Sequence, residues 1–163
     1  MTDNNDTELL RDKLFNKKEN GWNLTKEKDN IFNYAKGYIS FMNKAKTERE
    51  VVKQAKIIAE NSGFKDINNI DNLKPGDRVY YINREKSMYL AIIGKNNIED
   101  GVNIIGAHAD SPRLDLKPNP LYEDGEFAYF KTHYYGGIKK YQWTTIPLSI
   151  HGVIVNPNGE KIE

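Results

Sequence analysis

The sequence contains no cysteine among its 163 residues. A chain without cysteine forms no disulfide and binds no metal through a thiolate. Any metal ion would have to be held by histidine, aspartate or glutamate, and the chain has only 3 histidines. Candidate metal ligands are therefore few, and each histidine can be considered individually.

The sequence also lacks a strong charge of either sign, a long apolar run and a leader-like beginning. Its 24 basic and 23 acidic residues give a formal net charge of +1, so neither nucleic acid nor a membrane is expected as a partner. Apolar runs such as Tyr89–Ile93 are far shorter than the roughly 20 residues of a membrane span. The acidic, polar segment Met1–Glu8 is unlike a signal peptide. We therefore expect a cytoplasmic protein, and the length fits about one domain of roughly 100–200 residues.

The first half of the chain carries two helix patterns. Apolar residues recur at intervals of three and four between Thr25 and Ala45, which predicts one helix. Thr47 and Glu50 have the spacing of a capping box, and Gly63 stands where a left-handed residue commonly ends a helix. A second helix is expected between these signals.

The second half of the chain is rich in strand-like segments separated by turns. We expect strands at residues 79–82, 88–93, 102–105, 113–117, 127–134 and 148–155, the first two forming a hairpin. Pro118 and Pro120 should close the strand that starts at Arg113. A hairpin turn is indicated at 157–159, although a strand near Lys161 would need more chain to continue it. This order predicts an α/β fold with N-terminal helices packed on a mixed β-sheet.

A histidine and an aspartate stand together at the end of an apolar segment. Residues 102–107 lead to His108 and Asp110, just before the breaker pair Ser111-Pro112. In an extended chain the two side chains point to the same side, so Asp110 can accept one ring N–H and make the other nitrogen a better metal ligand. The same triplet is also consistent with a loop histidine beside a turn-forming aspartate. One histidine is not a zinc site, which needs three or four protein ligands.

The other candidate residues have ordinary structural explanations. His133 and His151 are interpreted as surface or partly buried histidines and not as ligands. The glycines in the segment 134–137 either form a tight turn between strands or let the backbone approach a neighbour closely. Acidic residues follow His108, but nothing in the sequence pairs them with it.

Two linked motifs resemble the aspartyl aminopeptidase and aminopeptidase I family of zinc metallo-exopeptidases. That family has a Gly-Ala-His-Thr-Asp-Ser-Pro segment, and this chain has Gly106-Ala-His-Ala-Asp-Ser-Pro112. The family's Tyr-Gly-Gly, Trp, Leu-Ser and Gly-Val then follow in order, here at Tyr135-Gly136-Gly137, Trp143, Leu148-Ser149 and Gly152-Val153. The resemblance covers roughly residues 25–155.

The resemblance implies a zinc-dependent aminopeptidase that hydrolyses the N-terminal residue of peptides, with two zinc ions in the complete enzyme. His108 corresponds to the first zinc ligand, and Asp110 to the acid of the catalytic site that orients and polarises that ligand. Ala109 stands in place of the usual Thr. The segment 144–147 stands where the family commonly has Asp-Arg-Asp, so any role of those charges does not carry over. Peptide substrates and a homo-oligomer of the full-length form are the implied partners.

Length is the main departure from the family. In family members the other metal ligands and the general-base glutamate come later, and an oligomerisation domain interrupts the catalytic domain. Residues 1–20 are polar, and we expect them to be a flexible N-terminus. Residues 21–163 would be the N-terminal part of the catalytic domain, truncated near that insertion and inactive alone. The alternatives are a non-catalytic half-domain that acts as an interaction or assembly module, or a regulatory or scaffolding domain.

Overall fold

A computed structural model describes residues 4–15 and 18–163 of the chain. The chain divides into two compact units, Met1–Ser40 and Phe41–Glu163. No helix in the described ranges has both the length and the apolar character needed to cross a membrane.

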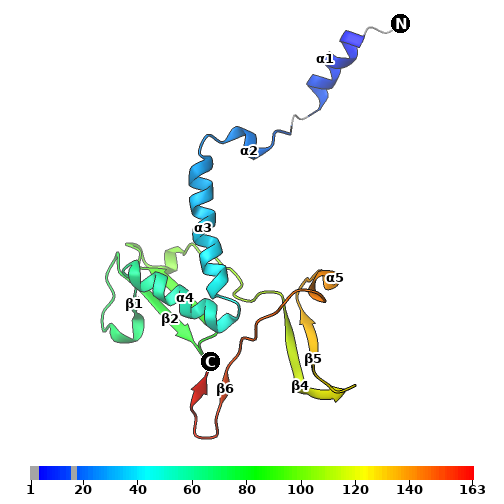
Figure 1. Cartoon of the computed structure of the whole chain (residues 1–163). Helices are drawn as coiled ribbons and strands as arrows, with labels where there is room; N and C mark the ends of the chain where they lie inside the picture. The colour runs from blue at the N-terminus through cyan, green and yellow to red at the C-terminus, as the bar shows by residue number, and fades with distance from the viewer. Residues whose placement is uncertain (1–3, 16–17) are drawn as a thin grey trace. The chain divides into compact units, whose positions relative to one another are not determined.

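The first unit is built of helices (Figure 1). Helix α1 is Asn4–Leu14, the short α2 is Gly21–Leu24, and α3 is Lys28–Lys44, which continues past the boundary into the second unit. The helix expected between residues 25 and 45 is therefore confirmed. The flexible N-terminus predicted for residues 1–20 lies partly outside the described residues, and its boundary stays a prediction.

Helix α4, Glu48–Asn61, begins and ends at the residues that the sequence indicated. The Thr47 hydroxyl accepts the N–H of Glu50 at 3.3 Å, and the Glu50 carboxylate accepts the N–H of Thr47 at 2.9 Å. These two bonds satisfy N–H groups that have no partner within the helix. At the other end Gly63 has φ +82°, and the N–H of Phe64 donates to the carbonyl of Ala59 at 2.9 Å. Local signals therefore set both ends of α4.

A mixed three-stranded sheet follows α4. Its strands are β1 (Lys65–Asp66), β2 (Arg78–Asn83) and β3 (Ser87–Ile92), in the order β1-β2-β3. β1 runs parallel to β2, and β2 pairs antiparallel with β3, which confirms the predicted hairpin. A one-turn 3-10 helix, Ile67–Asn69, lies between β1 and β2 in the chain, and another, Ile98–Asp100, follows β3.

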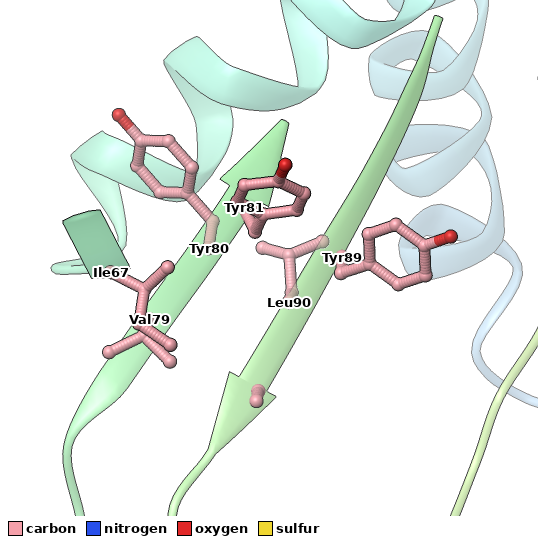
Figure 2. A pocket seen from close by; sticks show the side chains of 7 residues that line it. Ile67, Val79, Tyr80, Tyr81, Tyr89 and Leu90 are labelled. Atoms are coloured by element: carbon pink, nitrogen blue, oxygen red, sulfur yellow. The ribbon is translucent and has the colours of Figure 1, made fainter. Parts of the chain in front are cut away.

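The core of the second unit lies between α4 and this sheet (Figure 1). Val52 and Ala59 of the helix are buried, as are Val79 and Tyr80 of β2. The Tyr80 ring points toward the helix in Figure 2, and its hydroxyl donates to Glu60 at 2.8 Å. Burial, followed by this hydrogen bond, raises the pKa of Tyr80 to about 12. The α/β architecture with helices and a mixed sheet is therefore confirmed.

Tyr80 predicts a loss of stability at high pH. Because its folded-state pKa of about 12 exceeds the ordinary value of 10.0, its contribution is complete below pH 10.0 and disappears as the pH rises through about 12. Urea unfolding followed by circular dichroism should therefore give a free energy of unfolding that falls across this range. Tyr80→Phe should flatten the fall, whereas Tyr89→Phe, at a residue that is 62% exposed, should leave it unchanged. An equal slope in all three proteins would contradict the assignment.

Strands β4 (Arg113–Asp124) and β5 (Phe127–Tyr135) form a separate antiparallel pair. In Figure 1 they make a long two-stranded ribbon. The short helix α5 (Lys140–Trp143) follows the ribbon in the chain, after the bend at residues 136–139.

The prediction that prolines end the strand starting at Arg113 is wrong. The strand continues through Pro118 and Pro120, because the register shifts between Leu116 and Leu121 and leaves both prolines outside the regular ladder. Such an irregularity holds residues that cannot donate a ladder hydrogen bond without ending the strand.

Two other predicted strands do not form as expected. Residues 101–112 carry no strand in the described structure, and Ile104 and Ile105 are 82% and 98% exposed. Of the strand predicted at 148–155 only β6 (Ile154–Val155) forms, pairing with β7 (Lys161–Ile162) across the predicted turn. An apolar pattern becomes a strand only where a neighbouring strand completes the ladder. No described segment does so for residues 102–105.

Candidate functional site

His108 and Asp110 are brought together in the extended segment that leads into β4. The His108 Nδ1 atom lies 2.8 Å from the Asp110 Oδ1 and 2.8 Å from the Asp110 main-chain oxygen. A carbonyl oxygen can only accept a hydrogen bond, so Nδ1 carries the proton in both contacts. In the neutral ring Nε2 then keeps its lone pair, which is the form that binds a metal.

The Nε2 side of His108 is open to solvent. The side chain is 82% exposed, and Nε2 makes no hydrogen bond within residues 4–15 and 18–163. Over the same ranges, no group of three or more His, Cys, Asp or Glu is placed to hold a metal ion. The residues present therefore supply one ligand of a metal site and not the three or four protein ligands of a complete site.

Tyr135 joins this pair from the end of β5. Its hydroxyl donates to the Asp110 Oδ2 at 2.6 Å, so both carboxylate oxygens are engaged. The bond from Tyr135, then the backbone N–H of Asp110 and the bond from His108, outweigh partial burial and lower the pKa of Asp110. Asp110 is therefore an ionised carboxylate at neutral pH. The same bond, with the charge of Asp110, raises the pKa of Tyr135.

Gly136 brings Tyr135 close to Asp110. It has φ +72°, and a Cβ atom at this position would lie 3.3 Å from the Cα of Pro112. The sequence left open whether these glycines form a turn or permit a close approach. Gly136 does both, because a left-handed bend puts its backbone against the residue two places after Asp110.

Arg113 holds the ring of Tyr135 from the opposite strand. The two residues are partners in the β4–β5 ladder, and the guanidinium carbon lies 4.3 Å from the centre of the ring. Nε of Arg113 donates to Asp115 at 2.8 Å, and Nη1 lies 3.2 Å from a carboxylate oxygen of Glu48. Neither Tyr135 nor Arg113 was predicted from the sequence to be a site residue. The resemblance at the Tyr-Gly-Gly segment was the available signal for Tyr135.

The other two histidines lie in different surroundings. His133 is exposed on β5 and its side chain makes no hydrogen bond in the described part of the chain, although its ring stacks on that of Tyr134. His151 uses both ring nitrogens: Nδ1 donates to the Glu50 carboxylate at 2.7 Å, and Nε2 is hydrogen-bonded to the Ser149 hydroxyl at 2.8 Å. Among the described residues, neither histidine forms with His108 a group of three or more residues that could hold a metal ion.

The Glu50 carboxylate, which accepts the hydrogen bond from His151, also caps α4. Burial alone would raise the pKa of Glu50, but the bonds from His151 and from the N–H groups of Lys46 and Thr47 lower it. A cavity of about 120 Å³ lies beside this contact and is lined by both polar and apolar side chains. A second, shallow cavity of about 80 Å³ lies over β2 and β3 (Figure 2), and its lining contains no histidine or carboxylate.

Comparison with known proteins places these residues in a family. The family model described as aminopeptidase I zinc metalloprotease (M18) matches residues 41–163. A probable M18 family aminopeptidase 1 from Borrelia garinii subsp. bavariensis is 54% identical over 149 residues. A protein of the same name from Clostridium acetobutylicum is 47% identical over 152 residues.

The structural comparison agrees with the sequence comparison. The crystal structure of aminopeptidase I from Borrelia burgdorferi B31 is 51% identical with a TM-score of 0.81, covering 88% of this chain and 36% of that one. The two curated relatives match 90% of this chain but only 32% and 33% of their own lengths. The chain thus spans about a third of each relative, and the family match includes α4, the mixed sheet and the His108 segment. The chain belongs to the aminopeptidase I zinc metalloprotease family, M18.

Proposed function

We propose that this chain is part of a zinc-dependent aminopeptidase that removes the N-terminal residue of peptides. In this proposal His108 is one zinc ligand, and Asp110 orients it. The observation that carries the proposal is the outward, unpaired Nε2 of His108, whose other ring nitrogen is held by Asp110 at 2.8 Å. At zinc sites, the ring nitrogen of a histidine that does not bind the metal commonly donates its N–H to a carboxylate. The membership of the family supports the choice of metal and of reaction.

Zinc in such a site polarises the carbonyl of the scissile bond and lowers the pKa of a bound water molecule. The residues of this chain contribute position and basicity. His108 offers the Nε2 lone pair, while Asp110 accepts a hydrogen bond from Nδ1–H, fixes the tautomer and prevents rotation of the ring. Loss of such a supporting carboxylate typically costs about 10–100-fold in metal affinity or activity. Two zinc ions and peptide substrates belong to the same proposal.

This chain does not match about two thirds of each relative's sequence. We further propose that the remaining metal ligands and the general base lie in the region that corresponds to this unmatched part. The lack of a group of three ligand residues within residues 4–15 and 18–163 supports this assignment. We therefore expect no peptide hydrolysis by this chain alone. The assignment of residues 21–163 to a catalytic domain and a cytoplasmic location stay predictions from the sequence.

A chimaera tests the proposal. This chain would replace the aligned part of the Borrelia burgdorferi aminopeptidase I, to which it is 51% identical. We expect the chimaera to hydrolyse aminoacyl p-nitroanilides, to lose activity in a chelator and to regain it with zinc. A chimaera with the circular dichroism and assembly size of its active parent, but without hydrolysis, would contradict the proposal.

A second candidate function, as an assembly module, is favoured by the ribbon of β4 and β5. Phe127, Tyr129 and Tyr122 are 66%, 43% and 39% exposed on it, and the Tyr129 ring contacts the rings of the other two. Contiguous exposed apolar side chains commonly mark a surface that contacts another protein. Homo-oligomer formation through this ribbon would be visible by sedimentation of the purified chain. A monomer at every concentration would count against this candidate.

A further inference from the structure

The carboxylate of Asp110 is held at both of its oxygens. Oδ1 accepts from His108 at 2.8 Å, and Oδ2 accepts from the hydroxyl of Tyr135 at 2.6 Å. The second distance is that of a charge-assisted O–H···O⁻ bond, which is stronger than a bond between neutral groups. A carboxylate fixed at one oxygen can still swing about its side-chain bonds. Fixing the other oxygen as well defines the plane of the carboxylate and therefore the direction from which it meets the imidazole.

The hydroxyl of Tyr135 is itself placed by regular structure and not by a free loop. Tyr135 is the last residue of β5, and its ladder partner is Arg113, the first residue of β4. The guanidinium of Arg113 lies 4.3 Å from the centre of the Tyr135 ring. The next residue in the chain, Gly136, has its backbone against Pro112. Arg113 therefore covers one face of the Tyr135 ring, and the contact between Gly136 and Pro112 fixes the backbone next to Tyr135.

Arg113 is in turn fixed by two carboxylates. Asp115 accepts from Nε at 2.8 Å, and Glu48 lies 3.2 Å from Nη1. The side chain of Arg113 is 27% exposed, so its charge is partly shielded from solvent while it covers the ring of Tyr135. A continuous row of contacts thus runs from the first turn of α4 through Arg113 and Tyr135 to Asp110.

We propose that Tyr135 is a positioning residue for the candidate zinc ligand. By holding Oδ2 of Asp110, it keeps Oδ1 on the Nδ1–H of His108 and leaves Nε2 as the outward lone pair. The inference rests on the proposed role of His108. It adds a residue that touches neither metal nor substrate and acts only through Asp110.

The tautomer of His108 provides a direct test on the chain itself. In ¹⁵N-labelled protein, long-range ¹H–¹⁵N spectra above the ordinary histidine pKa of about 6.5 distinguish Nδ1–H from Nε2–H rings. The chain has 3 histidines, so His133→Gln and His151→Gln assign the signals. We expect His108 to be predominantly the Nδ1–H form in the unaltered chain. Tyr135→Phe should increase the Nε2–H form of His108 and leave the other two histidines unchanged.

Tyr134→Phe is the matched control. Tyr134 is the neighbouring tyrosine on β5, its ring contacts Lys140, and its hydroxyl has no hydrogen bond in the described chain. Both substitutions keep the aromatic ring, so the packing of Arg113 on residue 135 is retained. An unchanged tautomer in Tyr135→Phe, or an equal change in Tyr134→Phe, would overturn the inference.

Zinc binding by the active chimaera gives a second readout. Tyr135→Phe should weaken zinc affinity by about 10-fold, at the lower end of the range for lost supporting partners. It should lower kcat of the zinc-saturated chimaera with little change in KM, whereas Tyr134→Phe should leave both unchanged. Unchanged zinc affinity and kcat in Tyr135→Phe would overturn the inference. A chimaera that remains fully active after His108→Ala would instead overturn the proposed function, even if the tautomer responds to Tyr135→Phe.

Discussion

Replacing His108 by alanine in the chimaeric enzyme is expected to abolish the hydrolysis of aminoacyl p-nitroanilides. The substitution removes the exposed Nε2 atom of the imidazole ring that Asp110 holds. Its effect should exceed the roughly 10–100-fold loss expected when only the supporting carboxylate is changed, as in Asp110→Asn. Steady-state kinetics and the zinc content of the purified proteins measure both effects.

His133→Ala is the control for this experiment. His133 is exposed and lies on β5, and its side chain makes no hydrogen bond in the described residues, so its replacement should leave kcat and zinc content unchanged. Near-normal hydrolysis by His108→Ala would refute the role of His108. Equal losses in His108→Ala and His133→Ala would indicate a general defect in folding rather than the loss of a ligand.

Gly136→Ala is expected to have the largest effect on stability of the substitutions considered. A side chain at φ +72° costs about 1–2 kcal/mol relative to a right-handed conformation. The new Cβ would also lie 3.3 Å from the Cα of Pro112, so one of the two segments must move. We expect urea unfolding to show a loss of at least about 1–2 kcal/mol, together with a change in the His108 tautomer as Tyr135 moves.

Gly137→Ala is the matched control for Gly136→Ala. An added Cβ at Gly137 meets nothing within 4 Å, and Gly137 is not among the positive-φ residues. It should therefore be neutral or stabilising, because alanine has less conformational freedom than glycine in the unfolded chain. Equal losses at the two positions would mean that the close approach of Gly136 to Pro112 is not what holds the bend.

The elements that could be predicted from the sequence are those whose signals are local. Thr47, Glu50 and Gly63 are close in sequence to the helix ends that they define, and the structure confirms both ends of α4. The hairpin of β2 and β3 was likewise predictable, since its strands are joined by a few polar residues. Such contacts depend on neighbours in the chain and not on the rest of the fold.

Strands that depend on distant partners were predicted less well. Residues 102–105 have the composition of a strand but no ladder partner in the described structure. Conversely, the strand expected to end before Pro118 continues because β5 pairs with it on both sides of an irregularity. Apolar composition indicates what a segment prefers, while pairing decides what it forms.

The candidate site follows the same rule. His108 and Asp110 are two positions apart in the sequence, and their contact was predictable from the geometry of an extended chain. Tyr135 reaches Asp110 across 25 residues, and His151 reaches Glu50 across 101. Those two contacts depend on the register of the β4–β5 ladder and on the path of the C-terminal segment. Neither can be read from spacing.

Two glutamates in the first turn of α4 contact distant parts of the chain. Glu48 contacts Arg113, which covers Tyr135, while Glu50 caps the helix and also receives His151. Two otherwise separate stretches of the chain are thus anchored to adjacent carboxylates on one short piece of backbone. A substitution that loosens this turn should therefore disturb both stretches at once, and a double-mutant cycle between Arg113 and His151 should show that they are energetically linked.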